Sequence, residues 1–171
     1  MKSNIVEIKS YLLPYGEVIL GSFENRLCLC DWITGKHHKQ VKNRLSRNLQ
    51  AEFKAGNSIL IENAVQQLEE YFAKERKVFD VPLLLVGSDF QKRVWQELYS
   101  IPFGTTISYK ELSQKIGSPK AVRAVANAVG ANSISIFLPC HRVIGSNNSL
   151  TGYAGGLTVK QKLLELENTA F

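Results

Sequence analysis

The sequence predicts a two-domain chain: an N-terminal α/β domain over residues 1–80, with a small antiparallel sheet and a helix, and a mainly α C-terminal domain over residues 81–171. Two observations predict this. The first 35 residues alternate between apolar and polar positions with the period of a strand, whereas the residues after 88 repeat with the period of a helix. Val78–Val86 is apolar with a proline inside, which is typical of an extended linker between the two.

A hairpin is expected near the start of the chain. Glu17–Ser22 and Leu27–Trp32 have strand character, and a turn-like stretch separates them. Residues 36–47 are polar and basic, and we expect an exposed connection there. Ile61–Phe72 then places apolar residues on one helical face, with Asn63 as a candidate N-cap.

The second half of the chain contains two clear helix starts. Ser88 and Ser108 are each followed three residues later by Gln or Glu, which is the pattern of a capping box. The helix that starts after Ser108 is short. Gly117–Pro119 is a tight turn that joins it to an Ala/Val-rich helix over Lys120–Val129. Helix, glycine-containing turn and helix together predict a helix-turn-helix.

The second helix of this motif has two distinct sides. Lys120, Arg123 and Asn127 recur on one side and form an outward polar stripe. The inward stripe is apolar: Ala121, Val122, Val125 and Val129. The remaining positions are small: Ala124, Ala126 and Ala128. We therefore expect the helix backbone to lie close to a ligand surface, although a solvated charged face would have the same pattern and helix-turn-helix geometry also occurs in proteins that bind no DNA.

Charge favours a polyanionic partner. The formal net charge is +6, and Leu112–Leu164 contains no Asp or Glu. The cations of this stretch are Lys115, Lys120, Arg123, Arg142, Lys160 and Lys162. An acid-free basic surface suits DNA. The alternative is a neutral core stretch that happens to lack carboxylates.

Several protein classes are excluded by composition. No apolar run approaches the roughly 18 residues that a membrane span needs, so no membrane partner is expected. The polar N-terminus predicts no secretory signal, and three cysteines cannot all pair, which favours the reducing cytoplasm. Cys28 and Cys30 would lie on one face of a strand with His37 and His38 nearby, but buried apolar cysteines are the better interpretation, and we predict no metal.

Cys140 and His141 suggest nucleophilic chemistry. A thiolate is the nucleophile and an imidazole can accept its proton, although adjacent side chains point apart, so that a bridging water is as plausible as direct contact. A Cys-His dipeptide can also be purely structural. Glu167 ends a helix that a capping box of Thr158 and Gln161 would begin. A carboxylate there opposes the helix dipole and needs a cationic or hydrogen-bonding partner such as a histidine, unless it faces solvent.

Pro139–Val143 resembles the active-site signature of the O6-alkylguanine-DNA alkyltransferases, the methylated-DNA–protein-cysteine methyltransferases. The resemblance covers residues 88–167 strongly and the N-terminal part loosely. Its other motifs are Phe90–Trp95, Ile101–Gly104, Ser108–Tyr109, Arg123–Val125, Gly152–Leu157 and Lys160. It implies an N-terminal α/β domain packed on a winged-helix domain, and no cofactor.

The resemblance also implies roles for single residues. Cys140 would accept the alkyl group, His141 would activate it through water, and Glu167 would orient His141. Tyr109 would help rotate the target phosphate and supply a proton to the leaving guanine, and Asn132 would brace the turn beneath the site. In the base pocket, Tyr153 would form a wall, and main-chain groups of Cys140, Val143 and Ala154 would read the guanine edge.

Double-stranded DNA that contains O6-alkylguanine is the implied partner, bound through the minor groove by a monomer. Arg123 resembles the family's arginine finger, which enters the base stack while the damaged nucleotide swings out. Lys120 and Asn127 would add further DNA contacts. Transfer would be irreversible and would occur once per molecule.

Two departures from the family pattern are noted, and three alternatives stay open. Ser133 stands where relatives commonly have proline, so that turn is expected to be less rigid, and Ala154 lacks a hydroxyl that some relatives carry. The alternatives are a non-reactive binder of alkylated DNA, a helix-turn-helix regulator and a cysteine peptidase. The presence of Cys140, Glu167 and an outward Arg123 favours the alkyltransferase.

Overall fold

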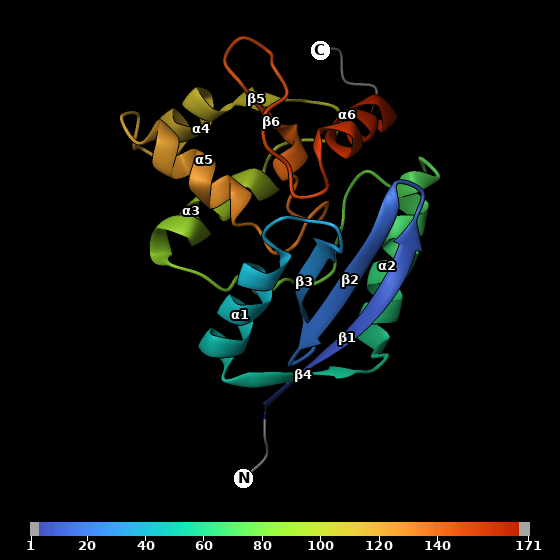
Figure 1. Cartoon of the computed structure of the whole chain (residues 1–171). Coiled ribbons are helices and arrows are strands. Elements are labelled where there is room, and N and C mark those ends of the chain that lie inside the picture. The colour runs from blue at the N-terminus through green and yellow to red at the C-terminus, as the bar shows by residue number, and fades with distance from the viewer. Residues whose placement is uncertain (1–3, 168–171) are drawn as a thin grey trace.

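The computed structural model describes residues 4–167 and places a four-stranded sheet at the N-terminal end (Figure 1). Its strands are β1 (Asn4–Leu13), β2 (Gly16–Phe23), β3 (Arg26–Trp32) and β4 (Ala51–Ala55). The spatial order is β3-β2-β1-β4, and the predicted hairpin of β2 and β3 is confirmed. β4 pairs with β1 in parallel, so the sheet is mixed and not purely antiparallel as predicted.

The prediction of an exposed connection over residues 36–47 is wrong. Helix α1 (His38–Leu49) occupies most of it and supplies the crossover that a parallel β1–β4 pair requires. Val41 and Leu45, one helical turn apart, are buried against the sheet. Leu49, one further turn along, is partly buried against the same cluster, and the other residues of the helix are polar, so three apolar residues indicated its inward side.

Helix α2 (Ile59–Phe72) packs on the other face of the sheet. It begins two residues before the predicted start, because Ser58 caps it by accepting a hydrogen bond from the Ile61 N–H. Asn63 lies inside the helix, so its predicted capping role is wrong. The extended segment 78–86 follows: Leu27 N–H donates to Pro82 O and Leu84 N–H donates to Leu27 O, both at 2.8 Å.

Two of the remaining helices begin at their predicted capping signals, whereas the last helix does not. α3 (Asp89–Tyr99) and α4 (Tyr109–Lys115) each begin with a complete capping box, as predicted. α5 (Val122–Gly130) packs on both. The short strands β5 (Ile107–Ser108) and β6 (Val143–Ile144) pair in parallel. α6 (Leu157–Leu166) follows Gly156, whose φ is +92°; it has no side-chain cap, so the predicted capping box of Thr158 and Gln161 is wrong.

One hydrophobic cluster joins the sheet to the later helices. It runs from α2 through Trp95 of α3 and Val125 of α5 to Leu163 of α6. The Trp95 indole donates to Ala128 O at 2.8 Å, so Ala128 faces this core and not a ligand surface. A smaller cluster lies between α1 and the sheet. Among the described residues, no helix has the length and apolarity to cross a bilayer.

Candidate functional site

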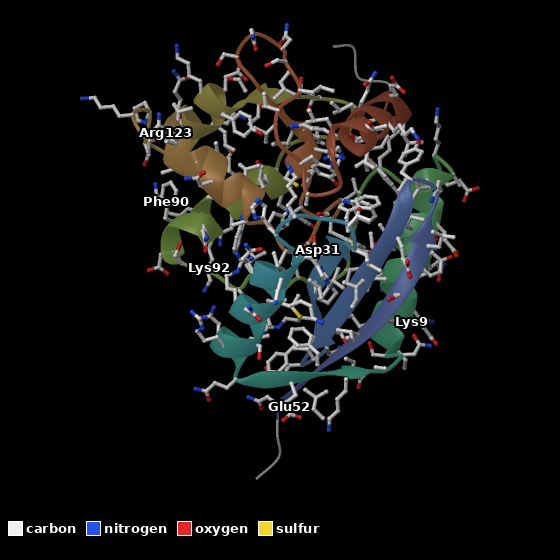
Figure 2. All side chains as sticks on the ribbon, in the orientation of Figure 1. Lys9, Asp31, Glu52, Phe90, Lys92 and Arg123 are labelled. Atoms are coloured by element: carbon white, nitrogen blue, oxygen red, sulfur yellow. The ribbon has the colours of Figure 1, made fainter. Side chains whose placement is uncertain are left out.

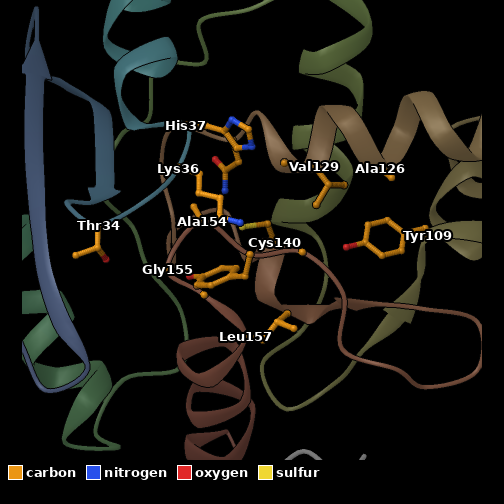
Figure 3. A pocket seen from close by; sticks show the side chains of 15 residues that line it. Thr34, Lys36, His37, Tyr109, Ala126, Val129, Cys140, Ala154, Gly155 and Leu157 are labelled. Carbon is orange, nitrogen blue, oxygen red and sulfur yellow. The ribbon is translucent and has the colours of Figure 1, made fainter.

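A cleft of about 520 Å³ opens where α5, the turn at Cys140 and two loops meet (Figure 3). This size lies in the usual range for small-molecule sites, about 300–1,000 Å³. One loop, residues 152–157, precedes α6, and the other, residues 34–37, connects β3 to α1. Cys140 lies on the floor of the cleft, and Tyr109, Asn132, Tyr153 and Ala154 also line it. The structure therefore brings these five predicted site residues together.

Cys140 opens a short 3-10 turn, Cys140–Arg142, and its N–H donates to Leu138 O at 2.7 Å. Asn132 ties the preceding segment together: its Nδ2 donates to Leu138 O at 3.0 Å and its Oδ1 accepts from the Ile134 N–H at 2.9 Å. Both hydrogen bonds are buried, so they fix the backbone that presents the thiol.

The turn at Ser133 is held to the sheet. The Ser133 hydroxyl donates to Cys28 O at 3.1 Å, and the Cys30 N–H donates to Ser133 O at 2.8 Å. We predicted a less rigid turn because serine lacks the ring of proline. The hydroxyl bond to β3 is a restraint that a proline side chain could not make, whereas the bond to the carbonyl would be available to either residue.

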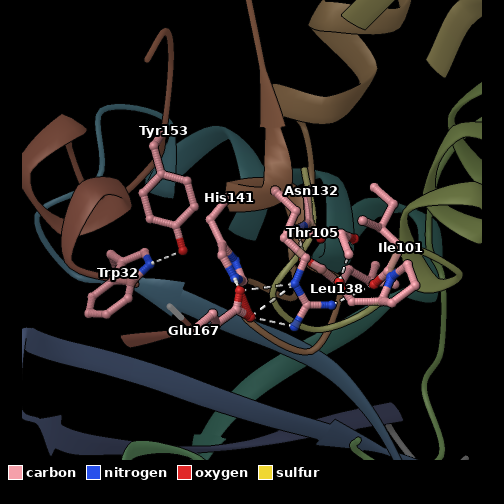
Figure 4. Close-up of polar contacts among 10 residues, drawn as sticks. Trp32, Ile101, Thr105, Asn132, Leu138, His141, Tyr153 and Glu167 are labelled. Atoms are coloured by element: carbon pink, nitrogen blue, oxygen red, sulfur yellow. Dashed lines mark hydrogen bonds and ion pairs between the residues drawn. The ribbon is translucent and has the colours of Figure 1, made fainter. Parts of the chain in front are cut away.

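His141 is fully buried and points at Glu167 (Figure 4). Its Nε2 lies 3.2 Å from both carboxylate oxygens of Glu167. An ionised carboxylate only accepts hydrogen bonds, so Nε2 carries the proton and Nδ1 keeps a lone pair. Among the described residues Nδ1 has no hydrogen-bond partner, which leaves it free to accept a proton.

Arg142 shares the same carboxylate. Its Nε donates to Glu167 Oε1 at 2.9 Å, and its Nη1 donates to Ile101 O at 2.6 Å. Only 5% of Arg142 is exposed. The prediction that Arg142 belongs to the basic surface of residues 112–164 is therefore wrong. The burial of Arg142 could have been inferred from the sequence, because Glu167 needs a cationic partner.

The buried charges set the protonation of the pair. Burial alone would raise the pKa of the Glu167 carboxyl, but hydrogen bonds and charges from His141 and Arg142 outweigh it and lower the pKa to about 2. Burial lowers the pKa of His141, and the nearby Arg142 cation adds to this, against the opposing effect of Glu167. At neutral pH the arrangement is therefore a carboxylate, a guanidinium and a neutral imidazole.

Lys160 is the second cation that the sequence wrongly placed on the surface. It is fully buried, and its Nζ donates to Val143 O at 2.6 Å, Thr151 O at 2.8 Å and Gly152 O at 3.2 Å. Burial lowers its pKa to about 8. These bonds tie the loop before α6 to the strand after Cys140, which makes Lys160 a positioning residue that the sequence motif did not reveal.

Burial raises the pKa of the Cys140 thiol, while Asn132 and the Lys160 cation lower it in part. The resting form is therefore the thiol, and a nearby base must take its proton before it can attack. Tyr109 faces the same cleft and donates its hydroxyl proton to Thr151 O at 3.0 Å. Burial also raises the pKa of Tyr109, so the phenol keeps its proton.

Tyr153 forms a wall of the cleft and is held from the N-terminal half of the chain. The Trp32 indole donates to the Tyr153 hydroxyl at 3.1 Å. A Cβ on Gly155 would lie 3.0 Å from the Trp32 ring, and one on Gly35 would lie 3.1 Å from Ala154 O, so both glycines permit a close approach of the two loops. Nothing in the sequence pattern singled out Trp32.

Val143 lies outside the cleft and is completely buried. Its N–H donates to Cys140 O and its carbonyl accepts from Lys160. Only the second lone pair of the Val143 carbonyl remains for a base edge. The N–H is already used, so the predicted contact of main-chain groups of Val143 with guanine stays a prediction in which the carbonyl is the available group.

The outward residues of α5 lie beside the cleft. Arg123 and Asn127 are exposed on α5, and Figure 2 shows Arg123 at the outer edge of the molecule. Lys120 is also exposed but lies before the helix, which begins at Val122 and not at Lys120 as predicted. Arg123 and Asn127 line a shallow hollow that shares Tyr109 and Ala126 with the cleft. The two depressions therefore form a continuous surface from Arg123 to Cys140.

The prediction that Cys28 and Cys30 lie on one face of a strand is wrong, because a β-bulge interrupts β3 at this point. Cys28 packs in the cluster beneath α1, and Cys30 packs in the main core. Over residues 4–167 no three His, Cys, Asp or Glu side chains are grouped as metal ligands.

Comparison with known proteins gives consistent matches. Residues 89–169 match the family model described as 6-O-methylguanine DNA methyltransferase, DNA binding domain. The constitutive methylated-DNA–protein-cysteine methyltransferase of Bacillus subtilis is 41% identical over 170 residues, covering 92% of this chain and 93% of that protein. A relative of the same name from Methanosarcina acetivorans is 44% identical, covering 91% and 94%.

Solved structures agree. A crystal structure of the Mycobacterium tuberculosis O6-methylguanine methyltransferase superposes with a TM-score of 0.80 at 40% identity, covering 95% of this chain and 92% of that one. A structure of the same organism's OGT in complex with DNA gives a TM-score of 0.81 with the same coverage.

Proposed function

The chain belongs to the methylated-DNA–protein-cysteine methyltransferase family, and from this premise we propose that it repairs DNA directly by moving the alkyl group of O6-alkylguanine onto Sγ of Cys140. One observation carries the choice of residue. Of the three cysteines in the sequence, Cys140 alone lines a cleft. It is also next to a neutral histidine whose Nδ1 is unpartnered within the described chain.

The reaction is a displacement at saturated carbon. The Cys140 thiol gives its proton to Nδ1 of His141 through a bridging water, and Sγ forms a bond to the alkyl carbon as the bond from that carbon to O6 breaks. Tyr109 gives its proton to the departing guanine, and the protonated His141 returns the thiol proton to the Tyr109 oxygen through water, so that both side chains regain their starting forms and guanine carries the one proton that the thiol lost. The product is a thioether, which has no low-energy route back.

Supporting residues would act through these groups. Glu167 holds the proton of His141 on Nε2, which keeps Nδ1 as the acceptor. Asn132 fixes the backbone before Cys140, and Tyr153 stands against the base. Main-chain groups of Cys140 and Ala154, with the second lone pair of the Val143 carbonyl, would meet the guanine edge.

Double-stranded DNA would approach over α5 from the minor-groove side. Lys120, Arg123 and Asn127 are exposed there, and the small Ala126 lets the helix backbone come close to the duplex. The damaged nucleotide would leave the stack and enter the cleft, and Arg123 would fill the space it vacates.

We also propose a division of the chain near residue 80. Residues 1–80 would form an α/β domain around the sheet, and residues 81–171 a winged-helix domain built on α3, α4 and α5. The family model, which begins at residue 89, supports this boundary. We propose the cytoplasm as the setting, because Cys140 must remain a reduced thiol to react.

The function is tested by the mass of the intact protein. With excess O6-methylguanine duplex, each molecule should gain one methylene, about 14 Da, and then stop, because the thioether cannot turn over. Peptide mapping should place the added mass on Cys140. Repeated turnover, or label on Cys28 or Cys30 with Cys140 unmodified, would overturn the assignment. A non-reactive binder, a regulator and a peptidase would all leave the mass unchanged.

For Arg123→Ala we expect much slower repair of duplex DNA, with little change in the reaction with free O6-benzylguanine. The reason is that a free base requires no flipping and leaves no gap to fill. Single-turnover rates on both substrates provide the measurement. Lys115→Ala, an exposed cation on α4, is the control. Equal losses on both substrates would instead indicate damage to the fold.

A further inference from the structure

A second acid-free basic stretch lies in the N-terminal half, where the proposed function makes no use of it. Trp32–Ala51 contains no Asp or Glu. Its cations are Lys36, Lys39, Lys42, Arg44 and Arg47. On α1, the exposed residues Lys39, Asn43 and Arg47 recur every four positions, opposite the buried Val41 and Leu45. We call these three exposed residues the α1 basic face.

α1 is fixed to the end of the helix that would read the DNA. The Arg44 guanidinium donates to Ala131 O at 2.6 Å, at the residue that ends α5. The same guanidinium lies 5.5 Å from the centre of the Trp95 ring of α3. Figure 1 shows α1 beside α3 and α5, on the side of the sheet opposite α2. The α1 basic face therefore keeps a fixed position relative to α5.

The cleft connects the two basic regions. Lys36 and His37, just before α1, line the cleft that contains Cys140. Figure 3 shows Tyr109 on one side of Cys140 and Lys36 and His37 on the other. A basic path thus runs from Arg123 over the cleft to the start of α1, without an acidic side chain among the lining residues.

We propose that the α1 basic face binds the phosphate backbone of the same DNA duplex, on the side of the lesion opposite Arg123. The proposal rests on the proposed function, since it requires DNA to be seated over the cleft. Neither Lys39 nor Arg47 forms an ion pair with any residue in the described part of the chain, so both cations are available to phosphates. Phosphate contacts add affinity without reading sequence, which suits repair of a lesion in any sequence.

The test compares two variants of equal charge. Lys39→Ala/Arg47→Ala removes the two cations of the α1 basic face, and Lys9→Ala/Lys54→Ala removes two exposed cations from strands β1 and β4. The affinity for an O6-methylguanine duplex is measured over a range of salt concentrations. Each lost phosphate contact lowers the slope of log affinity against log salt by about 1. We expect a fall of about 2 and roughly tenfold weaker binding for the α1 variant, and little change for the control.

The reaction with free O6-benzylguanine separates the possible failures. It should proceed at the wild-type rate in both variants, because neither pair of residues lines the cleft. An α1 variant with the same salt slope as its control would overturn the proposal. A slower free-base reaction in the α1 variant alone would also overturn it, because α1 would then act through the fold of the site. Absence of reaction in the wild-type protein would instead reject the proposed function.

Discussion

Cys140→Ala should abolish alkyl transfer completely and leave binding of alkylated duplex DNA nearly unchanged. In the proposed reaction the thiol is the only group that forms a bond to the alkyl carbon, and no other side chain that lines the cleft is a comparable nucleophile. It lies on the cleft floor with only 6% of its surface exposed, so it contributes little to the contact with phosphates. Intact-protein mass measures the transfer, and a DNA titration measures the binding.

Cys28→Ala is the matched control for this experiment. This substitution removes a thiol that is buried beneath α1, away from the cleft. The variant should still accept one methyl group per molecule. Mass gain by the Cys140 variant would show that another residue accepts the alkyl group. Loss of binding as large as that of Arg123→Ala would show that the thiol region carries the DNA contact.

Glu167→Gln should slow alkyl transfer about 100-fold or more, because a neutral amide replaces the carboxylate and no longer stabilises the imidazolium that forms when His141 takes the thiol proton. It should also destabilise the protein by about 3–5 kcal/mol, because Arg142 becomes an unpaired buried cation. These two effects must be separated. In Glu167→Gln/Arg142→Met both charges are absent, so stability should recover while the rate remains low. Thermal unfolding and single-turnover kinetics give the two readouts.

The pH dependence of stability offers a second readout of the same pair. The pKa of Glu167 is lowered from its ordinary value of 4.5 to about 2. The carboxylate is therefore stabilising at neutral pH, and this contribution is lost as the pH falls from about 4.5 to about 2. The double variant should lose less stability over that range than the wild type. Recovery of the transfer rate in the double variant would contradict the orienting role of Glu167.

Features with local causes were predictable from the sequence. The capping boxes at Ser88 and Ser108 each involve residues only three positions apart, and both are present. The hairpin of β2 and β3 has the same local origin. α1 was missed because polar and basic residues outnumber the three apolar ones that mark its inward side, Val41, Leu45 and Leu49. β4 was missed although Ala51–Ala55 alternates, because alanine, glutamate and lysine are depleted in strands and five residues give a weak signal.

The sequence predicted which residues gather at the site, but only some of the contacts between them. The need of Glu167 for a partner indicated His141, and the two do meet. Arg142 and Lys160 were counted as surface charges because a formal charge says nothing of burial. Their acceptors, Glu167 and three backbone carbonyls, come together only in the folded chain. Trp32 reaches Tyr153 across 121 residues of sequence, a separation that no periodicity reveals.

The placement of the three thiols limits each protein molecule to one reaction. Cys28 and Cys30 are buried outside the cleft, and burial raises the pKa of Cys28 to about 12 and that of Cys30 further, so neither ionises at neutral pH. Under the proposed function, each molecule would therefore accept one alkyl group, irreversibly, at Cys140. The unspent thiols in a population then equal the lesions it can still remove, and capacity is restored only by making new chains.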